Sequence, residues 1–464
     1  MNGERTILKI FNRTTLTRLP ALVASNSLLP GCFLAVLLID IYIYRKGYNW
    51  PPIRSDGFGY YVYLPAIFIH HDIFFTFLND QAFIEQVRGY YPFADWIWTG
   101  LTVQGDGFVD KYPIGTAIMQ LPFFLAGWTA ARLGSSGSLS GFEFPFQVAS
   151  CISAAFYFFA ALCILFRILT ARIAPSTATL CLLFAVTTTN VLLYASYDGA
   201  YPHIYSFFLV SALCAVVASS NKSIGRAFTF GLLLGLAVMV RPTNIVAALL
   251  FAKLAKYPGR PLLIELTRRV ALLILGFVLA ALPQVLIWLV TTGSPFYYSY
   301  RSEGFDFLHP HALSYLFSVR KGVFFWHPAF LLMICALVPH YQKFRLEASL
   351  FLAMIALNLY LGSAWISWFL GGSFGARQTV DVLPVMIIST GSAFAVLETA
   401  LPSFLALSRV VAIGLGLMNL GQMYGYMVNE ISSDGMTWDK YKSFWNQIPL
   451  VRAIEHSTRA AFPK

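Results

Sequence analysis

Long apolar runs with few charges are the feature of this sequence that most constrains its fold. A run of about 18 or more such residues is long enough to cross a bilayer as a helix. Two shorter runs, 227–240 and 242–252, are separated by Arg241-Pro242 and predict either two half-depth helices or a hairpin. The clear runs lie near residues 28–44, 145–166, 177–195, 204–220, 270–291, 326–340, 348–368, 379–399 and 404–427.

The composition supports a membrane protein. Of the 464 residues, 58% are hydrophobic and only 11% are charged, whereas a soluble domain carries about 25% charged residues. These values exclude an ordinary soluble enzyme, a disordered chain and a fibrous protein. The strands of a β-barrel alternate in polarity and do not produce such runs. The sequence therefore predicts an all-α polytopic membrane protein with about 10–12 transmembrane helices.

Basic residues are unevenly distributed among the connecting loops and predict the orientation. If residues 113–131 form an interfacial or re-entrant segment, the basic clusters of the short loops all fall on the cytosolic side with the N-terminus. A large first outer loop, about 45–144, then faces outward. We read 1–428 as one membrane domain and 429–464 as a short outer tail that associates with the interface. The other outer segments are 196–203, 292–325 and 369–378.

Neither the net charge of +11 nor the six cysteines indicate a nucleic-acid partner or a metal site. In this setting the charge is expected to face cytosol and lipid headgroups, not nucleic acid. The six cysteines lie in apolar segments without zinc-site spacing. His70-His71-Asp72 and His309-Pro310-His311 lack further ligand residues, so we expect no metal and no cofactor.

Asp56 is the first candidate for chemistry. It follows the first span by about ten residues, between Arg54-Ser55 and an aromatic stretch that begins at Tyr60. The stretch 60–75 predicts an amphipathic helix in the interface. An aspartate between lipid and water is expected to have a raised pKa, which suits a general base. Helix capping is the alternative role, because Ser and Asp are preferred caps.

Three basic residues are candidates for binding an anion. Lys111 lies late in the first outer loop, Arg241 interrupts an apolar stretch, and Arg377 follows a glycine-rich connector. A charge within an apolar stretch is costly and indicates function by default. Snorkelling to the interface is the alternative for the lysine and for Arg241. Possible acceptor-site or supporting residues are Tyr60, Asp198, His203 and Arg301.

Five short motifs make the chain resemble the GT-C class of membrane glycosyltransferases, near the protein O-mannosyltransferase and lipid A aminoarabinose transferase branch. They are the Asp56 motif, Lys111-Tyr112-Pro113, Asp198, Gly235–Pro242, and Gly372–Arg377 followed by Leu383-Pro384. The resemblance spans roughly residues 25–400. This chain departs from the class where Gly57 replaces the acidic residue after the aspartate and where Tyr112 replaces a proline.

The resemblance implies a GT-C-type fold and an enzyme of the bacterial inner membrane whose active site faces outward. It implies a sugar donor on a polyprenyl phosphate and a cell-envelope acceptor, which is a lipid, a glycan or a protein. The catalytic aspartate of the class falls on Asp56 and its phosphate-contacting lysine on Lys111. Inverting transfer of this kind needs a base for the acceptor hydroxyl and positive charge for the departing phosphate.

Two other functions stay open at this point. An O-antigen polymerase or ligase would use arginines and histidines of one late outer loop, and 292–325 contains Arg301, Arg320, His309 and His311. A lipid transporter or flippase would show internal repeats and access from both faces. No repeat is apparent, and the polar groups gather at one predicted membrane surface.

Overall fold

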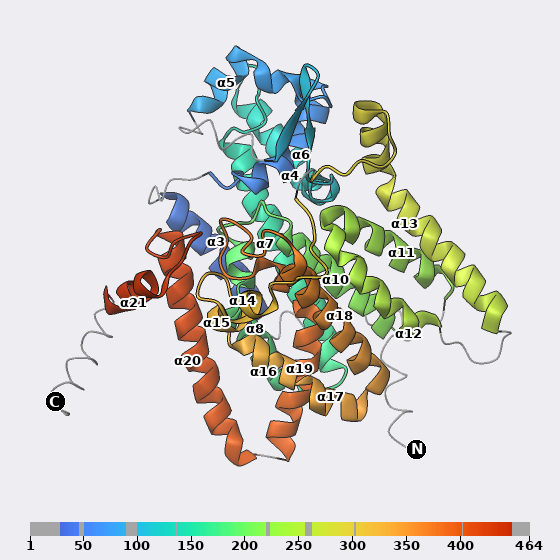
Figure 1. The fold of residues 1–464 in the computed structure, drawn as a ribbon, viewed down its shortest axis with the longest axis vertical. Helices are drawn as coiled ribbons and strands as arrows, with labels where there is room; N and C mark the ends of the chain where they lie inside the picture. The colour runs from blue at the N-terminus through green and yellow to red at the C-terminus, as the bar shows by residue number, and fades with distance from the viewer. Residues whose placement is uncertain are drawn as a thin grey trace.

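In the computed structural model the chain forms a bundle of helices with a smaller unit at one end of it, at the top of the view in Figure 1. The structure describes residues 28–45, 51–89, 100–135, 137–219, 223–255, 262–300, 303–400 and 402–447. The long helices of the bundle are α3 (Leu28–Arg45), α7 (Phe144–Thr170), α8 (Pro175–Thr188), α10 (His203–Ala218), α11 (Gly225–Val240), α13 (Leu262–Thr292), α18 (Arg345–Ala364), α19 (Leu383–Thr399) and α20 (Pro402–Met427).

The predicted all-helical membrane architecture is confirmed. Among the described residues, three helices are long and apolar enough to cross a membrane, namely Phe144–Thr170, Leu263–Thr292 and Arg345–Ala364. Six shorter apolar helices of 10–17 residues accompany them. The number of crossings, 10–12, stays a prediction.

Helix α13 lies at the edge of the bundle and packs along α11 (Figure 1). Most of its leucines and valines are exposed, including Leu279 and Leu286. Glycines allow the two helices to approach each other closely. A Cβ atom at Gly231 would lie 2.0 Å from the carbonyl oxygen of Leu273, and one at Gly276 would lie 2.3 Å from that of Phe228. Small residues at a crossing are typical of helices that associate within membranes.

The first outer loop folds into a compact unit of short elements around its own apolar core, which includes Phe58, Phe124 and Phe142. Its last element is α6, which packs against α7 and α4. Two short strands of this unit pair as an antiparallel hairpin, which is the one β-sheet in the described part of the chain. The elements are α4 (Asp56–Pro65), η2 (Ala66–His70), η3 (Thr76–Asn79), α5 (Gln81–Arg88), β1 (Leu101–Gln104), β2 (Gly107–Asp110) and α6 (Gly115–Gly134).

The structure corrects the predicted amphipathic helix of residues 60–75. Helix α4 begins earlier, at Asp56, and every residue in Gly57–Pro65 is buried. The part of the predicted segment up to Pro65 is covered on all sides and cannot lie half in the interface, whereas most of 66–75 is only partly buried. The segment 113–131 forms the single 20-residue helix α6 in spite of Pro122. Its predicted interfacial position remains a prediction.

Several apolar runs predicted as single helices are interrupted in the structure. The run 177–195 divides into α8 and α9 (Val191–Ala195), with a break at Thr189-Asn190. Because proline lacks an N–H and favours the first turn of a helix, breaks also occur next to prolines. The runs near 326–340, 242–252 and 379–399 consist of α15 (Val323–Trp326), α16 (Ala329–Cys335), α17 (Leu337–Lys343), η5 (Pro242–Phe251), α12 (Ala252–Ala255), η6 (Arg377–Asp381) and α19.

The outer tail contains the helix α21 (Trp438–Gln447), which packs against the bundle. The ring of Phe325 lies edge-on to those of Trp438 and Tyr441, and Phe444 is buried. These aromatic residues therefore cover protein surface, in addition to any contact with the interface. A short helix, α14 (Ala312–Phe317), lies in the loop between α13 and α15.

Candidate active site

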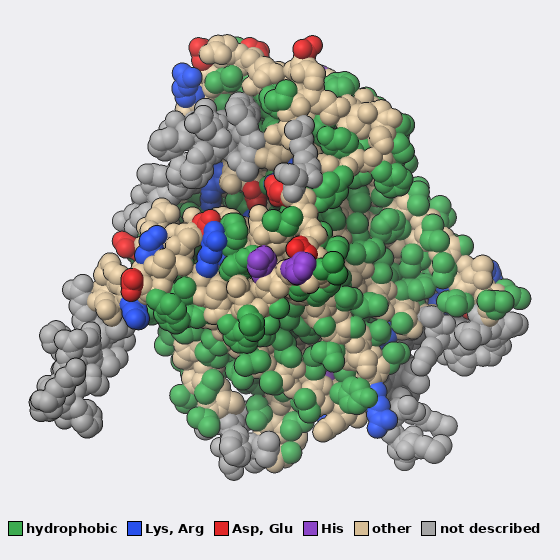
Figure 2. Space-filling view, in the orientation of Figure 1, with side chains coloured by type: hydrophobic (Ala, Val, Ile, Leu, Met, Phe, Trp, Pro, Cys, Tyr) green, Lys and Arg blue, Asp and Glu red, His purple; other side chains and the backbone are tan. Residues whose placement is uncertain are grey.

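A cavity of about 490 Å³ lies between the unit formed by the predicted first outer loop and the ends of the bundle helices next to it. Its wall contains six of the residues singled out in the sequence, from five separate stretches of the chain. Acidic and basic side chains gather between the outer unit and the bundle, whereas hydrophobic side chains cover most of the flank (Figure 2). The six residues are Asp56, Tyr60, Lys111, His203, Arg241 and Arg377.

Asp56 is the first residue of α4, and its carboxylate forms an ion pair with Arg377. The distance from Asp56 Oδ2 to Arg377 Nη1 is 2.8 Å. Burial alone would raise the pKa of Asp56. The charge of Arg377, a hydrogen bond from the Tyr112 side chain and the charge of Lys111 outweigh burial and lower the pKa below its usual value. The expectation of a raised pKa was therefore wrong, and Asp56 is ionised at neutral pH.

The glycines on either side of Phe58 allow close packing around Asp56. A Cβ atom at Gly57 would lie 2.9 Å from Ala200 Cβ, and one at Gly59 would lie 2.5 Å from the ring of Tyr112. The Tyr112 ring also stacks on Tyr60, with 4.2 Å between ring centroids. Glycine at these positions thus lets Tyr112 come close enough to Asp56 to hydrogen-bond to it.

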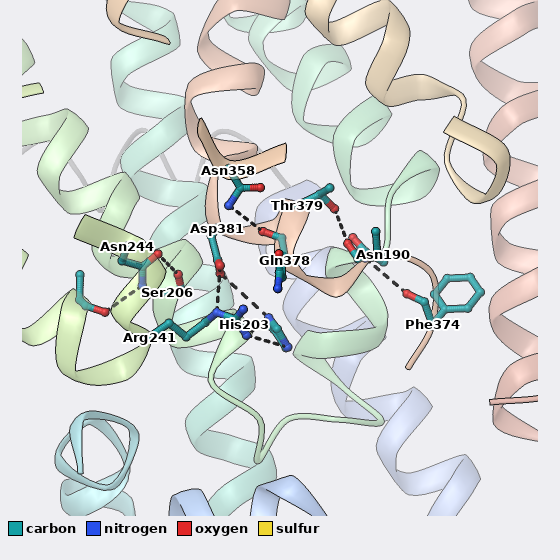
Figure 3. A network of polar contacts seen from close by, with 12 residues as sticks. Asn190, His203, Ser206, Arg241, Asn244, Asn358, Phe374, Gln378, Thr379 and Asp381 are labelled. Atoms are coloured by element: carbon teal, nitrogen blue, oxygen red, sulfur yellow. Dashed lines mark hydrogen bonds and ion pairs between the residues drawn. The ribbon is translucent and has the colours of Figure 1, made fainter. Parts of the chain in front are cut away.

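Arg241 lines the cavity at the point where α11 ends and η5 begins, and it has a carboxylate partner inside the protein (Figure 3). Its Nε atom is 2.9 Å from Asp381 Oδ2. Its Nη1 atom is 3.3 Å from His203 Nδ1, and His203 in turn is 4.0 Å from Asp381. Asn244 follows in the same turn and binds Ser206 and the Ala237 carbonyl.

The sequence analysis missed Asp381. The signal that could have identified it is the one used for Arg241, because Asp381 is an acidic residue inside the apolar run 379–399. Charges within apolar runs pair with one another. Two such residues of opposite sign, 140 positions apart, are therefore natural partners.

Lys111 lines the cavity and forms an ion pair with Glu303. The distance from Lys111 Nζ to Glu303 Oε1 is 2.8 Å. The same ammonium group is 5.4 Å from the ring centroids of Tyr112 and Tyr300. Ser299 Oγ donates a hydrogen bond to the Lys111 carbonyl at 2.7 Å. The connection that follows α13 thus packs directly on the lysine.

Asp198 does not line the cavity. It forms a buried ion pair with Arg54, in which Asp198 Oδ1 and Arg54 Nη2 are 2.7 Å apart. The same arginine donates to the Tyr197 carbonyl at 3.1 Å. The pair ties the segment in front of Asp56 to the second outer loop, so Asp198 supports the site from behind. Arg301 lies outside the described residues.

Lys321 is a second residue that the sequence analysis missed. It is buried, and its ammonium group donates to the carbonyl oxygens of Ser373 and Ser433. Burial lowers the pKa of Lys321 to about 7. Through Ser373 the lysine holds the glycine-rich connector that leads to Arg377. No sequence signal distinguished it from the other lysines of the loops.

The remaining wall of the cavity includes several aromatic side chains. No metal-ligand cluster is present in the part of the chain that the structure describes. Trp288 of α13, Tyr300, Trp365 and Phe369 line the cavity. Flat aromatic faces of this kind pack against the C–H faces of sugar rings. His309 is exposed and lies 3.2 Å from Asp306, outside the cavity wall.

No protein-family model matches the sequence, and no curated protein matches it. Among solved structures, the chain is similar to the archaeal oligosaccharyltransferase AglB from Archaeoglobus fulgidus, solved in complex with an inhibitory peptide and a dolichol-phosphate. The TM-score is 0.45 and the sequence identity is 13%. The match covers 92% of this chain and 59% of the AglB chain, so this chain spans less than two thirds of its length. A likeness of this size leaves the function to be argued from the residues of the cavity.

Proposed function

We propose that this protein is a membrane glycosyltransferase that moves a sugar from a polyprenyl-phosphate donor to a cell-envelope acceptor on the outer face of the bacterial inner membrane. The observation that carries the proposal is one cavity that contains an ionised carboxylate and three cations. Asp56 supplies the carboxylate, and Lys111, Arg241 and Arg377 supply the positive charge.

In the proposed reaction an acceptor hydroxyl attacks the anomeric carbon of the donor and inverts it. Asp56 takes the proton from the hydroxyl as the new C–O bond forms. The bond between the anomeric carbon and the phosphate oxygen breaks, and its electrons stay on the phosphate. The three cations stabilise this developing charge. Because phosphate is already a good leaving group, no second carboxylic acid is needed, unlike in glycoside hydrolysis.

The lowered pKa of Asp56 is consistent with this role. It makes the carboxylate a weaker base in the ground state, but it keeps the group ionised over the whole physiological range. The incoming hydroxyl loses its proton only as the bond to carbon forms, when its acidity rises steeply. An ionised carboxylate next to the reacting hydroxyl is then sufficient to take up the proton.

The position of α13 supports a lipid-linked donor. The helix places Trp288 in the cavity wall, and most of its other apolar side chains are exposed to the surroundings of the bundle. A prenyl chain that lies in the bilayer beside α13 would reach the cavity with its phosphate first.

The proposal is tested with the purified protein in lipid, by supplying polyprenyl-phosphate sugars with mixed lipid, glycan and peptide acceptors. Release of free polyprenyl phosphate is measured for wild type, Asp56→Asn and Asp106→Asn. Asp106 is exposed in the hairpin turn of the same outer loop and serves as the matched control. We expect Asp56→Asn to lose about 100-fold or more in rate, and the control to keep it.

Two results would contradict the proposal in different ways. A wild-type protein that is inert with every donor would argue against transferase activity. Equal rates for wild type and Asp56→Asn would remove Asp56 from the chemistry. Among the described residues of the late outer loop, Arg320 pairs with Asp434, and His309 and His311 are absent from the cavity wall, so these three do not favour the polymerase or ligase alternative.

A further inference from the structure

The cations of the cavity are already paired with carboxylates before any phosphate binds. Arg377 pairs with Asp56 at 2.8 Å, Arg241 with Asp381 at 2.9 Å, and Lys111 with Glu303 at 2.8 Å. The three pairs leave the site formally neutral. A donor phosphate would add negative charge to a partly buried site without net positive charge, which is unfavourable unless one carboxylate leaves.

The exposure of the three carboxylates shows which one can leave at the lowest cost. The side chain of Glu303 is 41% exposed, compared with 18% for Asp56 and 2% for Asp381. A partly exposed ion pair contributes little free energy, so a carboxylate that is already largely hydrated can move fully into water at low cost in free energy. Asp381 would have to leave a buried pair, and Asp56 is needed as the base.

The carbonyl and the amide of Glu303 both have hydrogen-bond partners, so rotation of its side chain is sufficient for the exchange. The Tyr298 hydroxyl donates to the Glu303 carbonyl at 2.6 Å, and the Glu303 amide donates to the Tyr300 carbonyl at 2.9 Å. The Lys111 ammonium remains positioned by the rings of Tyr112 and Tyr300, each 5.4 Å away. This distance lies within the range of cation–π attraction, about 6 Å.

We propose that Glu303 is the exchangeable counter-ion of the donor-phosphate site. It neutralises Lys111 while the site is empty and is displaced when the phosphate of the donor binds. After the reaction it competes with the phosphate of the product for Lys111. This inference rests on the proposed function. The charges of the two lipids give it a direction, because the donor phosphodiester carries one negative charge and the product monoester carries about −1.5 to −2 at pH 7.

This difference in charge creates a problem for turnover that Glu303 solves. The cations hold the product more strongly than the donor, since the product carries more negative charge. Without a competing anion, product release would become slow. A carboxylate tethered next to Lys111 is always present at high effective concentration. It therefore competes with the product phosphate and promotes its release.

The experiment measures binding of farnesyl phosphate, a short polyprenyl monophosphate, to the full-length protein in detergent, with farnesol and inorganic phosphate as tail-only and head-only probes. Glu303→Gln is compared with wild type and with Asp306→Asn, an exposed carboxylate of the same connection that does not line the cavity. We expect about fivefold tighter binding for Glu303→Gln, and no change for Asp306→Asn or for farnesol.

Two further measurements separate exchange from a general effect of charge. In the background Lys111→Gln, the additional change Glu303→Gln should no longer tighten binding, because the counter-ion has lost its cation. In the transferase assay, Glu303→Gln should lower the steady-state kcat by a larger factor than the single-turnover rate, because its loss slows the release of product.

The outcomes distinguish this inference from the proposed function. Unchanged or weaker binding by Glu303→Gln, while wild type binds farnesyl phosphate and Asp56→Asn is inactive, would overturn the role of Glu303 and leave the transferase proposal intact. Absence of farnesyl phosphate binding in both wild type and Glu303→Gln would overturn the phosphate site itself, and the role of Glu303 with it.

Discussion

At the scale of single residues, the charged and polar neighbours of Asp56 decide its protonation state, and its burial does not. Burial opposes ionisation, but Arg377, Tyr112 and Lys111 together lower the pKa of the carboxyl group. A carboxyl group with a lowered pKa contributes stability above its ordinary pKa, and this contribution is lost as the pH falls through the lowered value. The ion pair with Arg377 should therefore persist down to mildly acid pH.

The hydrogen bond from Tyr112 can be tested by the change Tyr112→Phe, which keeps the ring stacked on Tyr60 and removes the hydroxyl. The pKa of Asp56 should rise, because one group that favours the ionised form is lost. We expect the acid limb of the pH–rate profile to move upward by up to about one pH unit. The measurement is the initial transfer rate as a function of pH.

Tyr360→Phe is the matched control for this prediction. Its hydroxyl donates to the Phe307 carbonyl at 2.8 Å, away from Asp56. The acid limb of this variant should coincide with that of wild type. If the Tyr112→Phe profile did so too, the hydrogen bond would have no part in setting the pKa of Asp56.

At the scale of elements, the contact between α11 and α13 decides where one wall of the cavity lies. Helix α13 supplies Trp288 to the wall. Its Gln284 side chain accepts a hydrogen bond from the Ile114 amide at 2.7 Å, next to the segment that carries Lys111. Close packing at Gly231 and Gly276 thus bears on the site as well as on stability.

The change Gly231→Ala tests this packing. The added methyl group would lie 2.0 Å from the Leu273 carbonyl oxygen, so the helices must move apart. We expect a loss of about 1–3 kcal/mol in stability, measured as a lower thermal unfolding midpoint in detergent. Gly414→Ala on α20 is the control, because no atom lies within 4 Å of its added Cβ. Higher helix propensity should leave that variant unchanged or slightly more stable. Equal stability of both variants would contradict the close crossing.

At the scale of the whole molecule, basic residues from two of the predicted cytosolic loops meet in one cluster. Arg172 and Lys253 both bind the carboxylate of Glu347, and the His340 ring lies 3.2 Å from it. Loops that the charge distribution assigned to one side of the membrane therefore come together in space. The orientation itself remains a prediction.

The orientation can be measured with a membrane-impermeant maleimide in a background without native cysteines. Leu308→Cys lies in the loop after α13 and is 87% exposed, and Gln342→Cys lies at the end of α17 and is also exposed. In intact cells we expect the reagent to label Leu308→Cys only. Gln342→Cys should react after permeabilisation. The reverse pattern would place the cavity on the cytosolic side and contradict transfer at the outer face.

Local properties of the sequence determined the helical membrane class and identified four of the five charged residues in the described cavity wall, all except Glu303. Run length and the cost of a charge in an apolar stretch are both properties of neighbouring residues, so Arg241 could be identified without a structure. Only the tertiary structure decided the partners. Asp381, Glu303 and Arg54 are paired with residues far away in the sequence. The pKa of Asp56 depends on such partners, because electrostatic interactions follow distance in space and not separation along the chain.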